Sequence, residues 1–251
     1  MEDFNSYFSS AFLGKKIIIT GGTTGIGRAA AILLSSLGAQ CLICGRNQQQ
    51  IDETLDAIAA KNVRGGTGIA VDISSSEGIK SLFSQADDQL GGLDILINNA
   101  ALGFGSITDG EYEDWQYILN TNLLAYMACS REAINRFRPL GMGQIINIGS
   151  MSAEVREDGN AVYVATKTGI QGFSAALRKE VNPLGIKVSL IEPGAVDTDM
   201  QAGSSEDKIQ QINKQEMLPA ADIAWAIAFC IAQPPASDVV SLQIRPHLQL
   251  I

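Results

Sequence analysis

The chain has 251 residues, of which 46% are hydrophobic and 18% are charged, and 25 are glycines. This composition predicts one large folded domain and excludes an intrinsically disordered chain. The net charge of -9 opposes binding to phosphate backbones and to anionic membrane surfaces, so we expect neither nucleic acid nor membrane among the partners.

The N-terminus does not read as a secretory signal, because its first residues include two acids and no basic cluster. Phe4, Phe8 and Phe12 follow helical spacing and are predicted to pack against the body of the protein, so residues 1–13 are interpreted as an N-terminal extension. The longest apolar run, 223–232, is too short to cross a bilayer and predicts a buried helix. We therefore expect a cytoplasmic protein.

Short apolar runs alternate with longer helix-like segments along most of the chain. The runs that predict strands lie at 16–20, 41–45, 68–72, 93–99, 144–150, 186–194 and 239–244, and long helices are predicted at 112–137 and 161–181. β-branched runs separated by amphipathic helices indicate a parallel sheet covered on both faces. We predict a single α/β domain over residues 1–251, a Rossmann-like doubly wound parallel sheet of about seven strands in three α/β/α layers.

Two features of the chain need separate interpretation. Residues 199–218 show no clear element, and a stretch of this length predicts a substrate-binding loop. Cys41 and Cys44 form a CxxC pattern, but in an extended strand they point to opposite faces. Because Cys129, Cys230 and the one histidine are isolated, we predict no metal site and interpret the cysteines as reduced core residues.

A glycine-rich stretch, TGGTTGIG at 20–27, follows the first predicted strand and opens a helix. Gly21, Gly25 and Gly27 would let the backbone approach a pyrophosphate, and the helix N-terminus would point at this group. Glycines in this position between a hydrophobic strand and a helix predict nucleotide binding.

Two residues at the ends of the next strands indicate which nucleotide binds. Arg46 follows Gly45, where an acid would bind a ribose 2'-hydroxyl, so NADP(H) is favoured over NAD(H). Alternatively, Arg46 is a solvated loop residue. Asp72 is placed to accept a hydrogen bond from the adenine amino group, or else it caps the next helix.

Tyr163 and Lys167 are four residues apart in the predicted helix 161–181, so they lie on the same face. The two residues are either ordinary surface residues without a function or a pair that transfers a proton. A nearby ammonium would lower the phenol pKa from its usual value of about 10, which would make Tyr163 a usable acid and base. Ser150 follows a predicted strand and could join Tyr163 at one carbonyl oxygen, although alone it would be a turn residue or a cap.

These motifs together resemble the short-chain dehydrogenases/reductases of the single-domain type. The resemblance rests on TGGTTGIG at 20–27, VD at 71–72, NNA at 98–100, Asn122 in NTNL, Ser150 in INIGS, YVATK at 163–167 and EPGAVDT at 192–198. Two departures are visible, since Ala101 stands where the family usually has glycine and Thr166 where serine is frequent. Ala101 restricts the backbone, so the loop after the fourth strand is expected to run differently.

The resemblance implies a role for each matching residue. Tyr163 would be the general acid/base, Lys167 would lower its pKa and bind ribose, Ser150 would bind the carbonyl oxygen, and Asn122 would hold a water linked to Lys167. Asn98 would stabilise the sheet. The cofactor site would comprise Gly21, Thr23, Thr24, Gly25, Ile26, Gly27, Arg46, Asp72, Ile73, Asn99, Ala100, Tyr163, Lys167, Pro193, Gly194, Val196 and Thr198.

The expected function is that of an NADP(H)-dependent oxidoreductase that interconverts a carbonyl and a secondary alcohol. Ser150 and Tyr163 would contact the small-molecule substrate, and the resemblance implies a homotetramer or homodimer. A 3-oxoacyl thioester reductase is the first alternative, but it would need a basic surface for an acidic carrier. The second alternative, a non-catalytic dinucleotide-sensing or scaffolding protein, would usually lack the tyrosine, lysine or serine.

Overall fold

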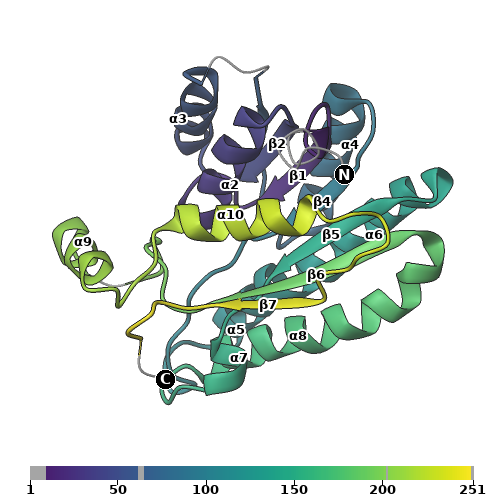
Figure 1. Cartoon of the computed structure of the whole chain (residues 1–251). Helices are drawn as coiled ribbons and strands as arrows, with labels where there is room; N and C mark the ends of the chain where they lie inside the picture. Colours follow the sequence, from purple (N-terminus) through teal and green to yellow (C-terminus); the bar gives the residue numbers. More distant parts are fainter. Residues whose placement is uncertain (1–9, 62–64, 202, 250–251) are drawn as a thin grey trace.

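In the part of the chain that the structure describes, a seven-stranded sheet lies between two layers of helices (Figure 1). The computed structural model describes residues 10–61, 65–201 and 203–249. The strands are β1 (Lys16–Thr20), β2 (Gln40–Gly45), β3 (Thr67–Ala70), β4 (Ile95–Asn98), β5 (Gly143–Ile148), β6 (Ile186–Pro193) and β7 (Ser241–Ile244). They pair in parallel in the order β3-β2-β1-β4-β5-β6-β7, which confirms the predicted doubly wound sheet.

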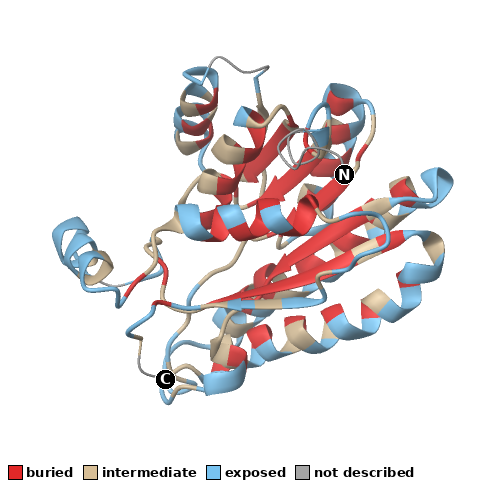
Figure 2. Ribbon diagram, viewed as in Figure 1, coloured by how far each residue is buried: buried red, intermediate tan, exposed pale blue. Residues whose placement is uncertain are grey.

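Two sets of helices cover the two faces of the sheet. One face carries α2 (Gly25–Ser36), α3 (Gln48–Ala59) and α10 (Ala220–Ile231), and the other carries α4 (Ser76–Leu90), α6 (Ala125–Phe137) and α8 (Ala161–Val181). Ile17 and Ile19 pack toward the first set and Ile18 toward the second, because side chains alternate along a strand. Both faces of β1 are therefore buried, and Figure 2 shows the buried strands between helices whose outer faces are exposed.

The cysteines follow the same alternation. Cys41 packs in the core beneath α2 and α3, whereas Cys44 packs in the core beneath α4, so the two thiols lie on opposite faces as predicted. Burial raises the pKa of Cys41 to about 11 and that of Cys44 to about 12, which keeps both in the thiol form at neutral pH. All four cysteines are buried and none forms a disulfide.

The segment 112–137 is not one uniform helix. It consists of α5 (Tyr112–Leu119), a π-helix (Asn120–Leu124) and α6. Short 3-10 turns follow α6 at Arg138–Leu140 and α8 at Asn182–Leu184, and a short helix, α7 (Ser152–Val155), precedes α8. Within the described ranges, no helix is both long and apolar enough to span a bilayer.

Two sequence-based expectations, one about the segment 199–218 and one about the N-terminal phenylalanines, have different outcomes. The segment 199–218 was expected to lack an element, but it contains α9 (Ser205–Asn213), which the sequence did not indicate because this helix buries none of its residues. Phe12 is fully buried, as predicted, whereas Phe4 and Phe8 lie outside the described residues.

Asn98 connects the sheet to the helices on the α6 and α8 side. Its amide donates to Asn147 Oδ1 on β5 at 2.9 Å and to Ser130 Oγ on α6 at 3.1 Å, and the Asn147 amide donates to Ser174 Oγ on α8 at 2.9 Å. Buried amides are costly unless they are paired, so this network holds α6 and α8 in one register against β4 and β5.

Candidate active site

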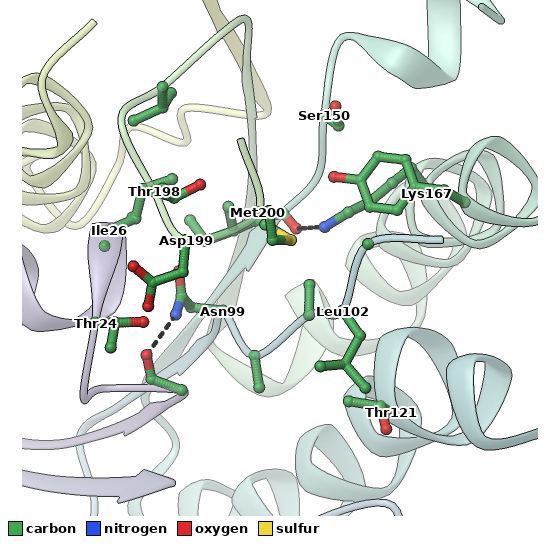
Figure 3. A pocket seen from close by; sticks show the side chains of 18 of the residues that line it. Thr24, Ile26, Asn99, Leu102, Thr121, Ser150, Lys167, Thr198, Asp199 and Met200 are labelled. Atoms are coloured by element: carbon green, nitrogen blue, oxygen red, sulfur yellow. Dashed lines mark hydrogen bonds between the residues drawn. The ribbon is translucent and has the colours of Figure 1, made fainter. Parts of the chain in front are cut away.

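The order of the strands reverses between β1 and β4, and ligands of doubly wound sheets bind beyond the strand ends at such a point. A cavity of about 1380 Å³ opens there (Figure 3). The predicted site residues that line it are Gly21, Thr23, Thr24, Gly25, Ile26, Arg46, Asp72, Ile73, Asn99, Ala100, Ser150, Tyr163, Lys167, Pro193, Gly194, Val196 and Thr198. Gly27 and Asn122, which are buried, do not line the cavity.

The glycine turn after β1 is held by the loop after β4. Gly21 has a φ of +62°, and a Cβ on it would lie 2.8 Å from Ala100 Cα. Asn99 donates from Nδ2 to Thr20 O at 2.9 Å and to Gly21 O at 3.0 Å. A Cβ on Gly27 would lie 2.1 Å from Gly21 O, so Gly27 allows α2 to approach the turn rather than contacting a ligand.

The N-terminus of α2 opens into this cavity. Thr24 is the N-cap of α2, but its side chain makes no capping hydrogen bond to the helix. The first backbone N–H groups of α2 therefore have no side-chain acceptor from their cap, and such groups bind phosphate oxygens well. The open helix end and the close-packed glycine turn fit the diphosphate of a dinucleotide.

A hydrogen-bonded chain crosses the cavity at the ends of β2 and β3. Arg46 Nη1 donates to the hydroxyl of Tyr117 at 2.9 Å, and this hydroxyl donates to Asp72 Oδ2 at 2.9 Å. Burial raises the pKa of Asp72, but hydrogen bonds from Ser74 and Tyr117 and the charge of Arg46 lower it further, to below its usual value. Asp72 does not cap α4, because Ser75 is the N-cap of that helix.

Ser150, Tyr163 and Lys167 come together at the other end of the cavity. Ser150 follows β5, and Tyr163 and Lys167 lie on α8. The Lys167 ammonium is 5.6 Å from the centroid of the Tyr163 ring, and its Nζ donates to Ile148 O at 3.0 Å. In Figure 3, Ser150 and Lys167 lie on one side of the cavity and Thr24 and Ile26 lie on the opposite side.

The expectation that Lys167 lowers the pKa of Tyr163 is not met in this structure. Burial raises the pKa of Tyr163, a hydrogen bond with Ser150 opposes this rise, and the charge of Glu157 adds to it. Lys167 is 2% exposed, and burial lowers its own pKa to about 7. A desolvated lysine carries a full positive charge for only part of the time near neutral pH, so it stabilises the phenolate less than the sequence suggested.

Asn122 lies in the π-helix and contacts a loop backbone. Its Oδ1 accepts from Leu102 N at 2.8 Å, and its Nδ2 donates to Leu102 O at 2.8 Å and to Thr166 Oγ1 at 3.4 Å. Both polar atoms of the side chain therefore hold the loop after β4. Ala101 in this loop keeps a negative φ, so the backbone accommodates alanine without strain.

The segment after β6 forms one wall of the cavity, and the C-terminal tail supports it. Lys208 on α9 donates to Thr198 O at 2.8 Å, and Gln249 Oε1 accepts from Ala195 N at 3.0 Å. Of the described residues in the segment 199–218, those that line the cavity are 199, 200 and 201.

Tyr117, Glu157 and Gln249 are among the further residues that line the cavity and that the sequence did not single out. Tyr117 sits in an ordinary helical pattern, Glu157 sits in a polar loop and Gln249 sits in an apolar tail. None belongs to a motif, so only long-range contacts reveal them.

The model of the short chain dehydrogenase family matches residues 15–209. The chain belongs to this family. One curated relative of this short-chain dehydrogenase is an uncharacterized oxidoreductase of Staphylococcus aureus strain N315. The two sequences are 30% identical over 233 residues, which cover 92% of this chain and 97% of the relative.

Solved structures of similar proteins agree with the fold of this short-chain dehydrogenase. A dehydrogenase/reductase from Sinorhizobium meliloti 1021 has a TM-score of 0.85 and 29% identity, and the match covers 97% of this chain and 98% of that one. A short chain dehydrogenase from Burkholderia cenocepacia J2315 in complex with NADP has a TM-score of 0.83 and 29% identity, with 94% and 98% covered.

Proposed function

We propose that this short-chain dehydrogenase uses NADP(H) to interconvert a carbonyl compound and a secondary alcohol. The observation that carries the proposal is that Ser150 and Tyr163 share one cavity with the glycine turn and the open end of α2. A dinucleotide that binds along this turn would extend toward the two hydroxyl groups.

Each residue at the reacting end has a distinct task. In the direction of reduction, the hydride for the carbonyl carbon would come from the nicotinamide of a cofactor held in this cavity. Tyr163 donates its phenolic proton to the carbonyl oxygen, and the Ser150 hydroxyl donates a hydrogen bond to the same oxygen as charge develops. Lys167, with a pKa of about 7, is suited to return a proton to Tyr163 and to bind the ribose hydroxyls.

The preference for NADP(H) rests on the opposite end of the cavity. Arg46 is exposed, so its guanidinium is available to a 2'-phosphate, and the Burkholderia cenocepacia relative was solved with NADP. Asp72, which accepts a hydrogen bond from the Tyr117 hydroxyl, would accept a further hydrogen bond from the adenine amino group. Thr24 and Gly25 would present backbone N–H groups to the diphosphate.

The test of this function combines turnover with cofactor binding. NADPH oxidation is followed by absorbance with a panel of small ketones, hydroxyketones, sugars and 3-oxoacyl thioesters, and NADPH binding is followed by fluorescence. Tyr163→Phe should lower kcat by about 10²–10⁴-fold or more, because the acid/base is lost, while the Kd for NADPH stays within about twofold. Tyr112→Phe, at a tyrosine that is 66% exposed on α5, is the matched control and should retain full activity.

The outcomes separate the proposed enzyme from its alternatives. Substantial turnover by the Tyr163→Phe variant would overturn the mechanism. Tight NADPH binding without turnover of any panel member would favour the non-catalytic dinucleotide-sensing alternative. Turnover of acyl thioesters alone would favour the 3-oxoacyl thioester reductase.

A further inference from the structure

A carboxylate stands in the wall of the cavity beside the proposed acid/base. Glu157 lies in the loop between α7 and α8 and lines the cavity together with Ser150 and Tyr163. Its Oε1 accepts from the hydroxyl of Ser152 at 3.0 Å. Its Oε2 is shielded from solvent and has no hydrogen-bond partner among the described residues. An unpartnered, shielded carboxylate oxygen is unfavourable, so a rotation of the Glu157 side chain that turns this oxygen toward a donor on a bound ligand would be stabilising.

Glu157 is within reach of the reacting groups. A short chain of hydrogen bonds connects it to Ser150, because Ser152 donates from its backbone N to Ser150 Oγ at 3.1 Å and from its hydroxyl to Glu157. The negative charge of Glu157 also contributes to the raised pKa of Tyr163. Glu157 therefore lines the same end of the cavity as Ser150 and Tyr163, where the carbonyl oxygen of the substrate would bind.

The cations of the cavity do not neutralise this carboxylate. Arg46 lies at the far end and donates to Tyr117, and Lys167 donates to Ile148 O. Among the described residues that line the cavity, these two are the basic side chains. The reacting end thus presents an acceptor with negative charge and offers no exposed cation to a carboxylate or phosphate of a substrate.

We propose that the substrate carries a hydrogen-bond donor, either a hydroxyl or an ammonium group, close to the reacting carbon, and that Glu157 accepts from this donor. The inference rests on the proposed carbonyl and alcohol chemistry and adds the substrate class. Ser150 and Tyr163 bind the reacting oxygen, and Glu157 selects the neighbouring group. Polyols, hydroxyketones and amino alcohols fit this arrangement, whereas keto acids and hydroxy acids are repelled by Glu157.

Four matched alcohols test the inference in the direction of oxidation with NADP⁺. They share a four-carbon chain and differ in one group: 2-butanol, 2,3-butanediol, 3-amino-2-butanol and 3-hydroxybutanoate. In the wild type, the diol or the amino alcohol should have a kcat/KM at least about tenfold above that of 2-butanol, the size of one charge-assisted hydrogen bond. The anionic 3-hydroxybutanoate should be the poorest substrate.

Variants at Glu157 assign the preference to this carboxylate and identify the donor. Glu157→Leu should abolish the preference, at least about tenfold in the wild type, for the diol or the amino alcohol over 2-butanol. Glu157→Gln keeps an oxygen acceptor, so it should reduce the preference for the amino alcohol much more than the preference for the diol. Glu154→Gln is the control, because Glu154 is exposed, pairs with Gln171 and does not line the cavity, so it should leave all ratios unchanged.

A binding measurement keeps the inference testable without turnover. The same four compounds are titrated into the NADPH-loaded protein, where no oxidation can occur, and binding is followed by cofactor fluorescence. In the wild type, the diol or the amino alcohol should bind at least about tenfold more tightly than 2-butanol. In Glu157→Leu, all three compounds should bind with similar affinity. Equal kcat/KM values or equal affinities for 2-butanol, the diol and the amino alcohol would overturn the inference. Oxidation of all of them at equal rates would leave the proposed function standing.

Discussion

Tyr117 joins two charged residues whose roles were predicted separately. It accepts from Arg46 and donates to Asp72, each at 2.9 Å, so one hydroxyl orients both side chains at the predicted adenosine end of the cavity. A long arginine that is already oriented loses less conformational entropy when it binds a phosphate. Tyr117 is therefore a positioning residue for Arg46.

Cofactor selectivity tests this role. Arg46→Ala should weaken NADPH binding by about tenfold or more and leave NADH binding nearly unchanged, because only NADPH carries the 2'-phosphate. Tyr117→Phe should weaken NADPH binding by about three- to tenfold, since Arg46 remains but is no longer held in place. Fluorescence titration gives both Kd values, and Tyr112→Phe on the same helix is the control. An unchanged ratio of the two affinities in Arg46→Ala would remove the basis for the NADP(H) preference.

The raised pKa of Tyr163 predicts different pH profiles for the two directions of reaction. Reduction needs the protonated phenol, which is present below the raised pKa, so titration of Tyr163 should not lower the rate of reduction from pH 7 to about 9. Oxidation needs the phenolate, so its rate should rise by up to about tenfold per pH unit over the same range. Initial rates at saturating cofactor measure both. A plateau of oxidation near pH 7 would mean that the bound cofactor and Lys167 together lower the pKa of Tyr163.

Among the elements, the π-helix between α5 and α6 explains the position of Asn122. A π-helix inserts one extra residue into a helical turn, which reorients the side chains around it, and such bulges are frequent at functional sites. Here Asn122 reaches both backbone polar groups of Leu102, so the helix supports the loop that carries Asn99 and Ala100. A uniform helix over 112–137 would not bring the amide to the same place.

Two glycine substitutions test how closely α2 must approach the glycine turn. In Gly27→Ala the new Cβ would overlap Gly21 O, so the free energy of unfolding should fall by about 1–3 kcal/mol and NADPH binding should be lost. Gly172→Ala on the exposed side of α8 meets no atom of the described residues within 4 Å, so stability should rise by about 0.5–1 kcal/mol. Urea denaturation measures both changes. Normal NADPH binding by Gly27→Ala would show that the turn tolerates displacement.

On the scale of the whole molecule, apolar side chains are exposed on both helical layers. Trp225 and Phe229 on α10 are 54% and 50% exposed, Leu124 at the end of the π-helix is 53% exposed, and Met127 on α6 is 38% exposed. Exposed apolar patches of this kind mark contact surfaces. We propose that further copies of this chain cover them, in line with the homotetramer or homodimer that the family resemblance implies.

Charge substitutions on α10 test the assembly. Trp225→Glu combined with Phe229→Glu should reduce the mass measured by sedimentation equilibrium, because two acids on each chain would face an apolar contact. Ile209→Glu on α9, at a residue that is 55% exposed, is the control and should leave the mass unchanged. A wild-type chain that sediments as a monomer at micromolar concentration would contradict the proposal.

Local patterns of the sequence predicted most of the fold. The strand at 16–20 and the helix at 161–181 have the bounds that the hydrophobic periodicity indicated. The spacing of apolar residues that distinguishes a strand from a helix involves only residues close together in the sequence. The spacing of Tyr163 and Lys167 likewise placed both on one face of a helix. The glycine turn could be located because it directly follows a strand and begins a helix.

Only the tertiary structure decided how these residues interact. Tyr117 meets Arg46 and Glu157 lines the cavity beside Tyr163 because segments distant in the sequence converge at the strand ends. The raised pKa of Tyr163 and the lowered pKa of Lys167 depend on burial, which is a property of the packed molecule rather than of residue type or spacing. The sequence by itself determined the family, the sheet and the reactive groups, because these follow from local periodicity and ordered motifs. The contacts and the electrostatic environment of the site required the fold, because they arise from residues that meet only after the chain has folded.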